Sequence, residues 1–223
     1  MRNCLIMDLD DTLFPEYEYV RSGFKAVDDY LVSNHGLVGF LEKANEIFES
    51  GERGDIFNQY LDSMSINYDE KFIITLVNIY RHHKPEISLY KDAVWVFSQF
   101  ARTHRFGLIT DGWSVTQKNK IAALGIKQKF NSIVITDELG PKYWKPHKKP
   151  YLLTQKKLNT TGCNCIYVGD NPKKDFVTPK KLGWLTVQVK RDRGEYKDLS
   201  VKQEYCANFE IASLFELESI IKN

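Results

Sequence analysis

Five short apolar runs recur along the chain and predict the strands of a sheet. Each run is nearly continuous instead of alternating with polar residues, which is typical of parallel strands covered on both faces. The runs are Cys4–Met7, Phe106–Ile109, Ile133–Ile135, Ile166–Val168 and Leu185–Val189. We therefore expect a parallel sheet in the interior of the protein.

Patterns with helical spacing separate the later runs. They predict one helix over Asp92–Thr103, a second over Ser114–Leu124 and a third over Pro150–Leu158. Gly125 follows the second helix at the C′ position, where a left-handed residue commonly ends a helix. Strands that alternate with helices predict an α/β fold with a doubly wound, mainly parallel, Rossmann-like sheet.

The segment after the first run interrupts this alternation. Between Phe14 and about Pro85 there is no convincing strand, and apolar residues recur at helical spacing. The helical stretches are Val20–Leu31, Leu41–Phe48, Ile56–Met64 and Phe72–Ile79. We expect a helical domain over residues 15–86, inserted into an α/β core of residues 1–14 and 87–223.

The composition narrows the class of protein. Of 223 residues, 43% are hydrophobic and 27% are charged, as in an ordinary soluble globular protein. The net charge of +2 gives no reason to expect nucleic acid or a membrane surface as a partner. Four cysteines without a C-x-x-C pair, and no apolar run that could span a bilayer, favour a reduced, cytoplasmic location.

Polar residues follow each of the first four apolar runs. In open α/β sheets, ligands bind outside the carboxyl ends of the strands, so residues far apart in sequence meet at one edge. The polar residues in question are Asp8 and Asp10, then Thr110-Asp111-Gly112, then Lys145-Pro146, and finally Gly169-Asp170 with Asp175. We expect them to form one site.

The order of these motifs resembles that of the haloacid dehalogenase-like hydrolase (HAD) superfamily. The pattern is Asp-x-Asp-x-Thr, a Thr at a strand end, Lys-Pro, and then Gly-Asp-x-x-x-x-Asp. The helical insertion directly after the first motif is similar to subfamily I, whose members carry a helical cap there. The stretch FEIASLFELESII near the end of the chain resembles the family's closing strand and helix.

The resemblance implies a phosphoric monoester hydrolase. Such a phosphatase would act on a small phosphorylated metabolite, with a sugar phosphate or a nucleotide monophosphate as the leading candidates, through an aspartyl-phosphate intermediate. Asp8 would be the nucleophile, because phosphoryl transfer requires positioning more than nucleophilic strength. Asp10 would act as general acid and then general base, a role that contributes typically about 10²–10⁴-fold. Specificity is expected from the helical cap.

The same resemblance implies a Mg²⁺ cofactor. Asp8, Asp170 and the backbone carbonyl of Asp10 would be its ligands, since Mg²⁺ prefers oxygen. A divalent cation would also explain three carboxylates in the stretch IMDLDDTL, because two like charges at about 4 Å near a surface cost on the order of 4 kcal/mol. Asp11 has no catalytic role here and either faces solvent or caps the next turn.

Phosphate binding is expected from Thr110 and Lys145. Thr110 would donate its hydroxyl, together with the backbone N–H groups of Asp111 and Gly112, and Lys145 would act as a point charge. Lys142 is the rival of Lys145 in a stretch that also holds Lys148 and Lys149. The other lysines of this stretch are interpreted as a solvated face.

Asp175 has three possible roles. It could orient Asp170 through water, it could pair with Lys145, or it could be a surface residue of a helical turn opened by Asn171 and Pro172. The pair His82-His83 is interpreted as a helix end.

Other functions remain open or are disfavoured. A phosphomutase with the same intermediate and a non-catalytic phosphate-binding module are the alternatives. The sequence contains no P-loop, no dinucleotide fingerprint after the first strand and no G-x-S-x-G motif. A true dehalogenase is disfavoured because the family's dehalogenases lack the acid/base residue present here as Asp10. Both a monomer and a homodimer are compatible with the sequence.

Overall fold

The computed structural model describes residues 2–222 and divides into two compact units. Unit 1 comprises the described parts of Met1–Glu16 and Ser88–Asn223, and unit 2 comprises Tyr17–Ile87. The inserted unit thus starts two residues later and ends one residue later than the sequence predicts.

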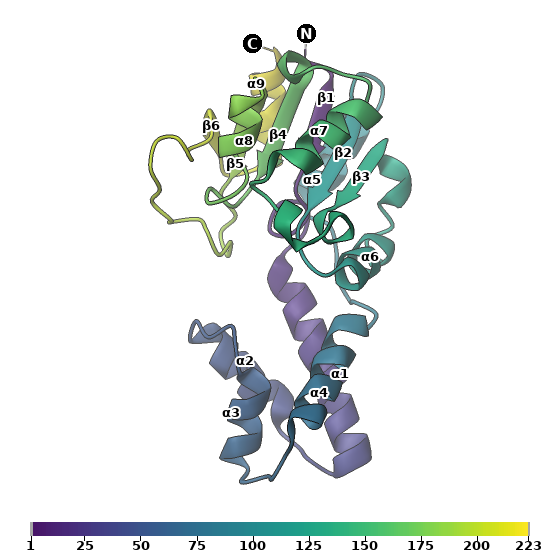
Figure 1. Ribbon diagram of the computed structural model, residues 1–223, viewed down its shortest axis with the longest axis vertical. Coiled ribbons are helices and arrows are strands. Elements are labelled where there is room, and N and C mark those ends of the chain that lie inside the picture. Colours follow the sequence, from purple (N-terminus) through teal and green to yellow (C-terminus); the bar gives the residue numbers. More distant parts are fainter. Residues whose placement is uncertain (1, 223) are drawn as a thin grey trace. The chain divides into compact units, whose positions relative to one another are not determined.

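A parallel sheet forms the centre of unit 1 (Figure 1). Within residues 2–222 it has six strands in the order β3-β2-β1-β4-β5-β6, and every neighbouring pair is parallel. The strands are β1 (Cys4–Met7), β2 (Arg105–Thr110), β3 (Ser132–Ile135), β4 (Cys165–Gly169), β5 (Leu185–Val189) and β6 (Phe209–Ile211). The prediction of an α/β fold with a mainly parallel sheet is confirmed.

The two central strands are covered on both faces. All four residues of β1 and all five of β4 are buried, although successive side chains of a strand point to opposite faces. This double burial explains why the strands are continuous apolar runs in the sequence. Free Cys4 and Cys165, which are register partners, are both buried and act here as small hydrophobic residues.

The strand order creates a switch point between β1 and β4. Strands β2 and β3 follow on one side of β1, and β4, β5 and β6 follow on the other. Doubly wound sheets with this order bind ligands at the carboxyl ends of the strands, where the order reverses. Asp8 lies directly after β1 and Asp170 directly after β4, so both lie at this point.

Helices connect the strands of unit 1. They are α5 (Lys91–Gln99), α6 (Ser114–Ala123), α7 (Lys148–Lys157), α8 (Val177–Lys181) and α9 (Leu217–Lys222), with short 3-10 turns η1 (Lys127–Lys129), η2 (Thr136–Leu139), η3 (Pro141–Tyr143), η4 (Gly162–Asn164) and η5 (Leu214–Glu216). In Figure 1, α7 and α8 lie in front of the sheet. Tyr151 of α7 packs in a core cluster with Ile6, Ile109 and Tyr167 of the strands.

Two predicted helix ends differ from the structure. Helix α5 stops at Gln99 instead of Thr103, because its apolar face ends with Phe100 and residues 101–103 are exposed. Helix α7 begins at Lys148, two residues before the predicted start, since Pro150 is tolerated in a first turn and the His147 ring accepts a hydrogen bond from the Lys149 N–H.

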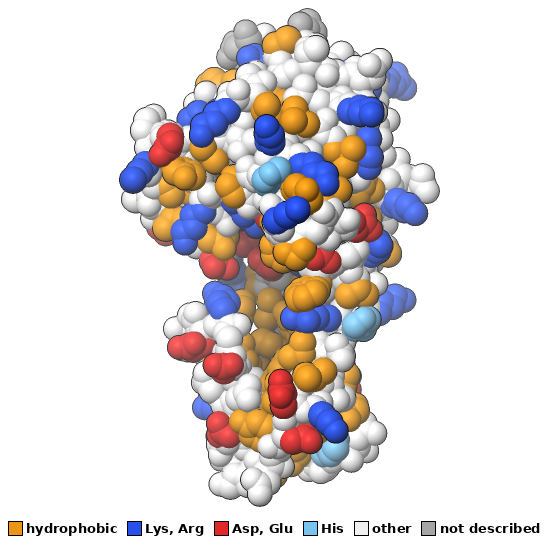
Figure 2. Space-filling view, viewed as in Figure 1, with side chains coloured by type: hydrophobic (Ala, Val, Ile, Leu, Met, Phe, Trp, Pro, Cys, Tyr) orange, Lys and Arg blue, Asp and Glu red, His pale blue; other side chains and the backbone are white. Residues whose placement is uncertain are grey.

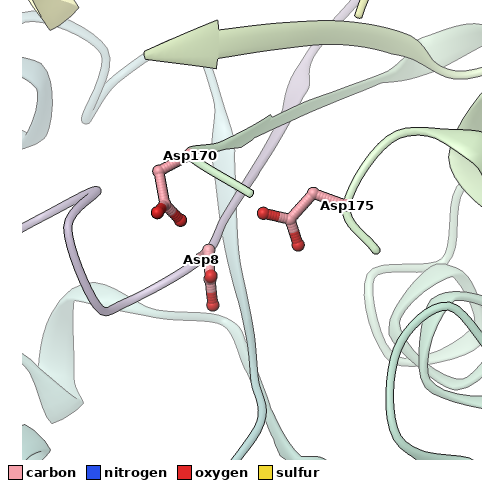
Figure 3. Close-up of side chains that lie close together, drawn as sticks. All are labelled: Asp8, Asp170 and Asp175. Atoms are coloured by element: carbon pink, nitrogen blue, oxygen red, sulfur yellow. The ribbon is translucent and has the colours of Figure 1, made fainter. Parts of the chain in front are cut away.

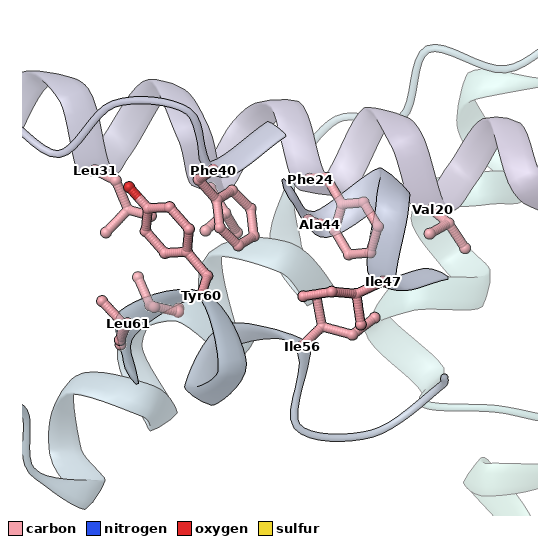
Figure 4. Packing of buried hydrophobic residues seen from close by; sticks show 11 residues of the cluster. Val20, Phe24, Leu31, Phe40, Ala44, Ile47, Ile56, Tyr60 and Leu61 are labelled. Carbon is pink, nitrogen blue, oxygen red and sulfur yellow. The ribbon is translucent and has the colours of Figure 1, made fainter. Parts of the chain in front are cut away.

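Unit 2 has its own helical core. Its helices are α1 (Glu16–His35, whose first residue belongs to unit 1), α2 (Phe40–Glu49), α3 (Ile56–Ser63) and α4 (Glu70–His82). Figure 4 shows the buried side chains of this core, in which Phe40 makes edge contacts with Phe24 and Tyr60. His82 ends α4 and His83 is its C-cap residue, as the sequence predicts.

Charged side chains on the face drawn in Figure 2 do not form a single stripe. On the face drawn in Figure 2, Lys and Arg are interspersed with hydrophobic and neutral side chains. No helix within residues 2–222 is both long enough and apolar enough to cross a membrane.

Candidate active site

Three buried carboxylates converge at the switch point. Asp8 follows β1, and its backbone N–H donates to the carbonyl of Val168 in β4 at 2.9 Å, so the two strand ends are joined. Asp170 follows β4, and Asp175 lies in the loop that comes next. One oxygen from each carboxylate lies within 4.8 Å of the other two, and Figure 3 shows the three side chains gathered around one small region.

Lys145 is the cation of this cluster. Its Nζ lies 2.9 Å from Asp8 Oδ1 and 2.8 Å from Asp175 Oδ1, and it donates to the Tyr167 hydroxyl at 3.2 Å. Burial alone would lower the pKa of Lys145, but Asp175 and Asp8 outweigh it and hold the pKa well above its usual value. The ammonium group is therefore charged in the site.

The rival Lys142 lies elsewhere. It is exposed on η3, and its Nζ lies 5.0 Å from the centre of the Tyr143 ring. Lys148 and Lys149 are exposed as well, in agreement with a solvated face. Of the lysines in this stretch, Lys145 alone contacts Asp8 within the described residues.

Asp175 is a buried residue whose carboxylate links Lys145 and Tyr167 to the backbone of Asn171. One of its oxygens binds Lys145 and Tyr167, and the other accepts the backbone N–H of Asn171 at 3.0 Å. Its side chain lies over Gly169, where a Cβ atom would collide with the carboxylate. The segment after Asn171 does form one helical turn, since the backbone N–H of Asp175 donates to the Asn171 carbonyl at 3.0 Å. The interpretation of Asp175 as a surface residue of that turn is wrong, because its carboxylate is turned inward and fully buried.

Asp170 differs from Asp175 in having no donor. Within residues 2–222 its buried carboxylate accepts no hydrogen bond, while its backbone carbonyl accepts one from the Gln188 side chain. Burial, with Asp175 and Asp8 nearby, raises its pKa well above the usual value. Burial likewise raises the pKa of Asp8 to about 7, although Lys145 opposes the rise.

These carboxylates fit a hard divalent cation. Asp8 and Asp170 offer buried oxygens, burial and the neighbouring carboxylates raise the pKa of both groups, and the donor set contains oxygen alone. The oxygens of Asp175 already hold Lys145 and Asn171. Asp175 therefore supports the loop of Asp170 instead of offering a free ligand.

The Asp10 side chain contacts two residues of helix α6. Its Oδ1 lies 2.6 Å from Lys120 Nζ and its Oδ2 accepts a hydrogen bond from the Gln117 amide at 2.9 Å. The Gln117 amide also donates to the Thr110 hydroxyl. Helix α6 thus connects the Asp10 carboxylate to the end of β2.

Thr110, Asp111 and Gly112 form the turn after β2. Thr110 is fully buried, and Gly112 has a φ of 116°, a left-handed conformation that favours glycine. The Asp111 carboxylate accepts from the Thr136 hydroxyl at 2.7 Å and from the Lys145 backbone N–H at 3.1 Å. Burial opposes ionisation of Asp111, but Lys145 and Lys174 outweigh it and lower its pKa.

Asp11 caps the next helix. It is buried, has a φ of 47°, and its Oδ1 accepts the backbone N–H of Glu16, the first residue of α1, at 2.9 Å. Of the two predicted roles, the capping role is confirmed and the solvent-facing role is wrong.

Several residues of the site have no motif in the sequence. They are Gln117, Lys120, Thr136, Tyr167 and Lys174, each of which binds a predicted residue through its side chain. One signal existed for Gln117 and Lys120, because they share the buried face of α6 with Ile121. A polar residue on an apolar face requires a partner.

Comparisons with known proteins agree with this geometry. The family model described as haloacid dehalogenase-like hydrolase matches residues 5–189. A glyceraldehyde 3-phosphate phosphatase of Methanocaldococcus jannaschii is 29% identical over 98% of this chain and 96% of its own length. A second glyceraldehyde 3-phosphate phosphatase, of Methanopyrus kandleri, is 25% identical over 100% of this chain and 98% of its own length. The crystal structure of a HAD phosphatase from Thermococcus onnurineus shares the fold, with a TM-score of 0.65 at 22% identity over 98% of this chain and 97% of its own.

The sheet, the order of its strands and the carboxylates at its switch point define a doubly wound α/β protein with a polar site at the carboxyl ends of its strands. The chain belongs to the haloacid dehalogenase-like hydrolase family. It is an enzyme, a phosphatase of that family, so the alternative of a non-catalytic binding module is set aside.

Proposed function

We propose that the chain is a Mg²⁺-dependent phosphatase that hydrolyses a small sugar phosphate through an aspartyl phosphate on Asp8. The observation that carries the proposal is the buried contact between Asp8 Oδ1 and Lys145 Nζ, 2.9 Å apart, beside the unpaired carboxylate of Asp170. This arrangement places a nucleophile next to a cation that can hold a transferring phosphoryl group.

In the first half-reaction, an oxygen of Asp8 bonds to phosphorus as the bond to the leaving oxygen breaks. Asp10 gives its proton to that oxygen, so the product leaves as a neutral alcohol. In the second half-reaction, Asp10 takes a proton from water, which bonds to phosphorus and releases phosphate from Asp8. Asp10 thereby recovers the proton it gave away, and the enzyme returns to its starting state.

The remaining residues hold the phosphoryl group. Lys145 offers positive charge, Thr110 a hydroxyl, and Asp111 and Gly112 offer backbone N–H groups at the end of β2. Asp8, Asp170 and the backbone carbonyl of Asp10 would hold Mg²⁺, which when bound offsets the negative charge of the carboxylates and the phosphoryl oxygens.

A sugar phosphate is the proposed substrate class. The support comes from the two relatives named above, which match over nearly their whole lengths and are named for a phosphorylated three-carbon sugar. A nucleotide monophosphate is the second class to be tested.

A phosphate-release screen over triose, hexose and nucleotide monophosphates tests the proposal. We expect hydrolysis that is fastest for a sugar phosphate, stops with excess chelator and returns with Mg²⁺. Ca²⁺ should support it poorly, because its larger and looser coordination shell displaces Asp8 relative to phosphorus. Asp8→Asn should remove turnover while the fold is kept, and Asp170→Ala should reproduce the loss of the metal.

Three results would contradict the proposal. Full activity in excess chelator excludes the metal, and transfer of phosphate to a second position of the sugar without release identifies a mutase. A preference for nucleotide monophosphates over every sugar phosphate excludes the proposed substrate class.

A further inference from the structure

The buried polar side chains of helix α6 include Gln117 and Lys120, which have no role in the reaction proposed above. Gln117 is 1% exposed and Lys120 is 3% exposed, and both lie one turn apart on the same helix. Burying a charged or amide side chain costs free energy unless its polar atoms are paired. The partners of these two side chains therefore show why the helix retains them.

Both side chains reach the Asp10 carboxylate. Lys120 Nζ lies 2.6 Å from Oδ1, and the Gln117 amide donates to Oδ2 at 2.9 Å. Each oxygen of Asp10 is thus held by a different donor. Two donors from a rigid helix fix the rotation of the carboxylate as well as its position.

Each of the two side chains has a second contact in the same region of unit 1. The Gln117 amide also binds the Thr110 hydroxyl, and Lys120 Nζ lies 3.8 Å from Glu16 and 5.7 Å from the centre of the Phe14 ring. Lys120 therefore ties α6 to the segment that follows Asp10, and Gln117 ties Asp10 to the end of β2.

We propose that Gln117 and Lys120 are positioning residues that aim the Asp10 carboxylate at the leaving oxygen of the substrate. The inference rests on the acid/base role proposed for Asp10. A proton donor contributes only when it is within hydrogen-bond reach of the reacting atom, so a carboxylate free to rotate loses part of its effect. The Asp8–Lys145 ion pair is held by a different residue, Asp175, whose Oδ1 lies 2.8 Å from Lys145 Nζ.

The test compares two substrates in variants of Lys120. An aryl phosphate has a leaving group that scarcely needs a proton, whereas a sugar phosphate has a poor leaving group. In Lys120→Met we expect kcat for the sugar phosphate to fall by about 10-fold or more, and kcat for the aryl phosphate by less than about threefold. Lys120→Arg, which keeps a donor and a charge, should restore most of the loss.

The controls separate positioning from general damage. Lys118→Met alters a neighbouring lysine of α6 whose side chain is 60% exposed and pairs with Glu138, and it should leave both rates unchanged. Gln117→Leu removes the hydrogen bond to the other oxygen of Asp10. It should also slow hydrolysis of the sugar phosphate more than that of the aryl phosphate. In an Asp10→Asn background, Lys120→Met should change neither rate by more than about twofold, since its effect passes through Asp10.

The outcomes distinguish this inference from the proposed function. If Asp10→Asn slows both substrates equally, Asp10 is no acid or base and the proposed mechanism fails. If Asp10→Asn is selective for the sugar phosphate but Lys120→Met and Gln117→Leu slow both substrates equally or neither, the mechanism stands and the positioning role is wrong.

Discussion

At the scale of single residues, Asp92 shows how a buried charge is stabilised away from the site. Arg191 binds its two oxygens at 2.6 and 3.0 Å, and the Ser213 hydroxyl and the Leu214 backbone N–H each donate at 2.8 Å. Burial alone would raise the pKa of Asp92, but these partners lower it below its usual value. The pair connects α5 with the chain after β5 and with η5.

This pKa shift predicts a pH-dependent stability. A carboxyl group whose pKa is lower in the folded state stabilises the fold above its unfolded pKa, and loses that contribution as the pH falls through the folded pKa. We expect Asp92→Asn to lower the free energy of unfolding by about 3 kcal/mol at pH 7, because Arg191 loses its buried partner. The difference in the free energy of unfolding between Asp92→Asn and the wild type should become smaller below about pH 4.

Urea unfolding of both proteins at pH 7 and at pH 3.5 measures this difference. Asp192→Asn is the control, since Asp192 is exposed and its ion pair with Lys197 lies at the surface. A difference of equal size at both pH values would contradict the assignment to the Asp92 carboxylate.

Gly169 makes a second residue-scale prediction. A Cβ atom there would lie 2.8 Å from Asp175 Cγ, inside van der Waals contact. Gly169→Ala should therefore displace Asp175 from Lys145, costing about 1–3 kcal/mol of stability and most of the activity. Gly54→Ala, where a Cβ atom meets nothing within 4 Å, is the control. Wild-type turnover in Gly169→Ala would show that the contacts of Asp175 are dispensable for activity.

The sequence predicted the site only as far as its motifs follow strands. Asp8, Thr110 and Asp170 were predictable because parallel strands end at one edge of a sheet, whatever their separation along the chain. For Gln117 and Lys120 the shared face with Ile121 could only indicate burial, because the fold alone brings α6 to Asp10 and so identifies their partner.

At the scale of elements, unit 2 is stabilised by aromatic packing between its helices. Phe40 is fully buried, and its ring centre lies 6.0 Å from that of Phe24, 5.7 Å from that of Phe57 and 5.1 Å from that of Tyr60. These contacts join α1, α2 and α3.

Removing this ring should destabilise unit 2. We expect Phe40→Ala to cost about 3–5 kcal/mol, since a fully buried ring leaves a cavity. Thermal unfolding followed by circular dichroism measures the loss, with Ile74→Ala, at a 50% exposed position of α4, as the control. Equal midpoints for Phe40→Ala and the control would show that the cluster contributes little.

Element boundaries were harder to predict than the elements themselves. The apolar runs identify β1 and β5 to the residue, because a charged residue, Asp8 or Lys190, directly follows each run. The end of α5 was predicted four residues too late, since a sequence pattern does not show that the surface it would cover ends at Phe100. Helix α7 was predicted to start at its proline, although proline also occurs inside a first turn.

At the scale of the whole molecule, every residue proposed for phosphoryl transfer belongs to unit 1. Thr110 and Lys145 would contact the phosphoryl group, which all substrates share. Thr110→Val should therefore lower kcat/KM for sugar phosphates, nucleotides and acetyl phosphate by the same factor. If Thr110→Val instead reverses the ranking of the substrates by kcat/KM, Thr110 contacts the leaving group and its assignment to the phosphoryl group is wrong. Substitution of one of the few unit 2 residues that contact the leaving group is expected to change the order.

In the proposed mechanism, Asp8 carries the phosphoryl group during turnover. This role is tested by acid-quenching Asp10→Asn at short times with an aryl phosphate and mapping the phosphorylated peptide, since loss of the general base slows breakdown of the intermediate. We expect a burst of one aryl alcohol per enzyme, matched by one phosphate on Asp8. Phosphate on a different residue, or alcohol and free phosphate released in equal amounts from the first turnover, would contradict it.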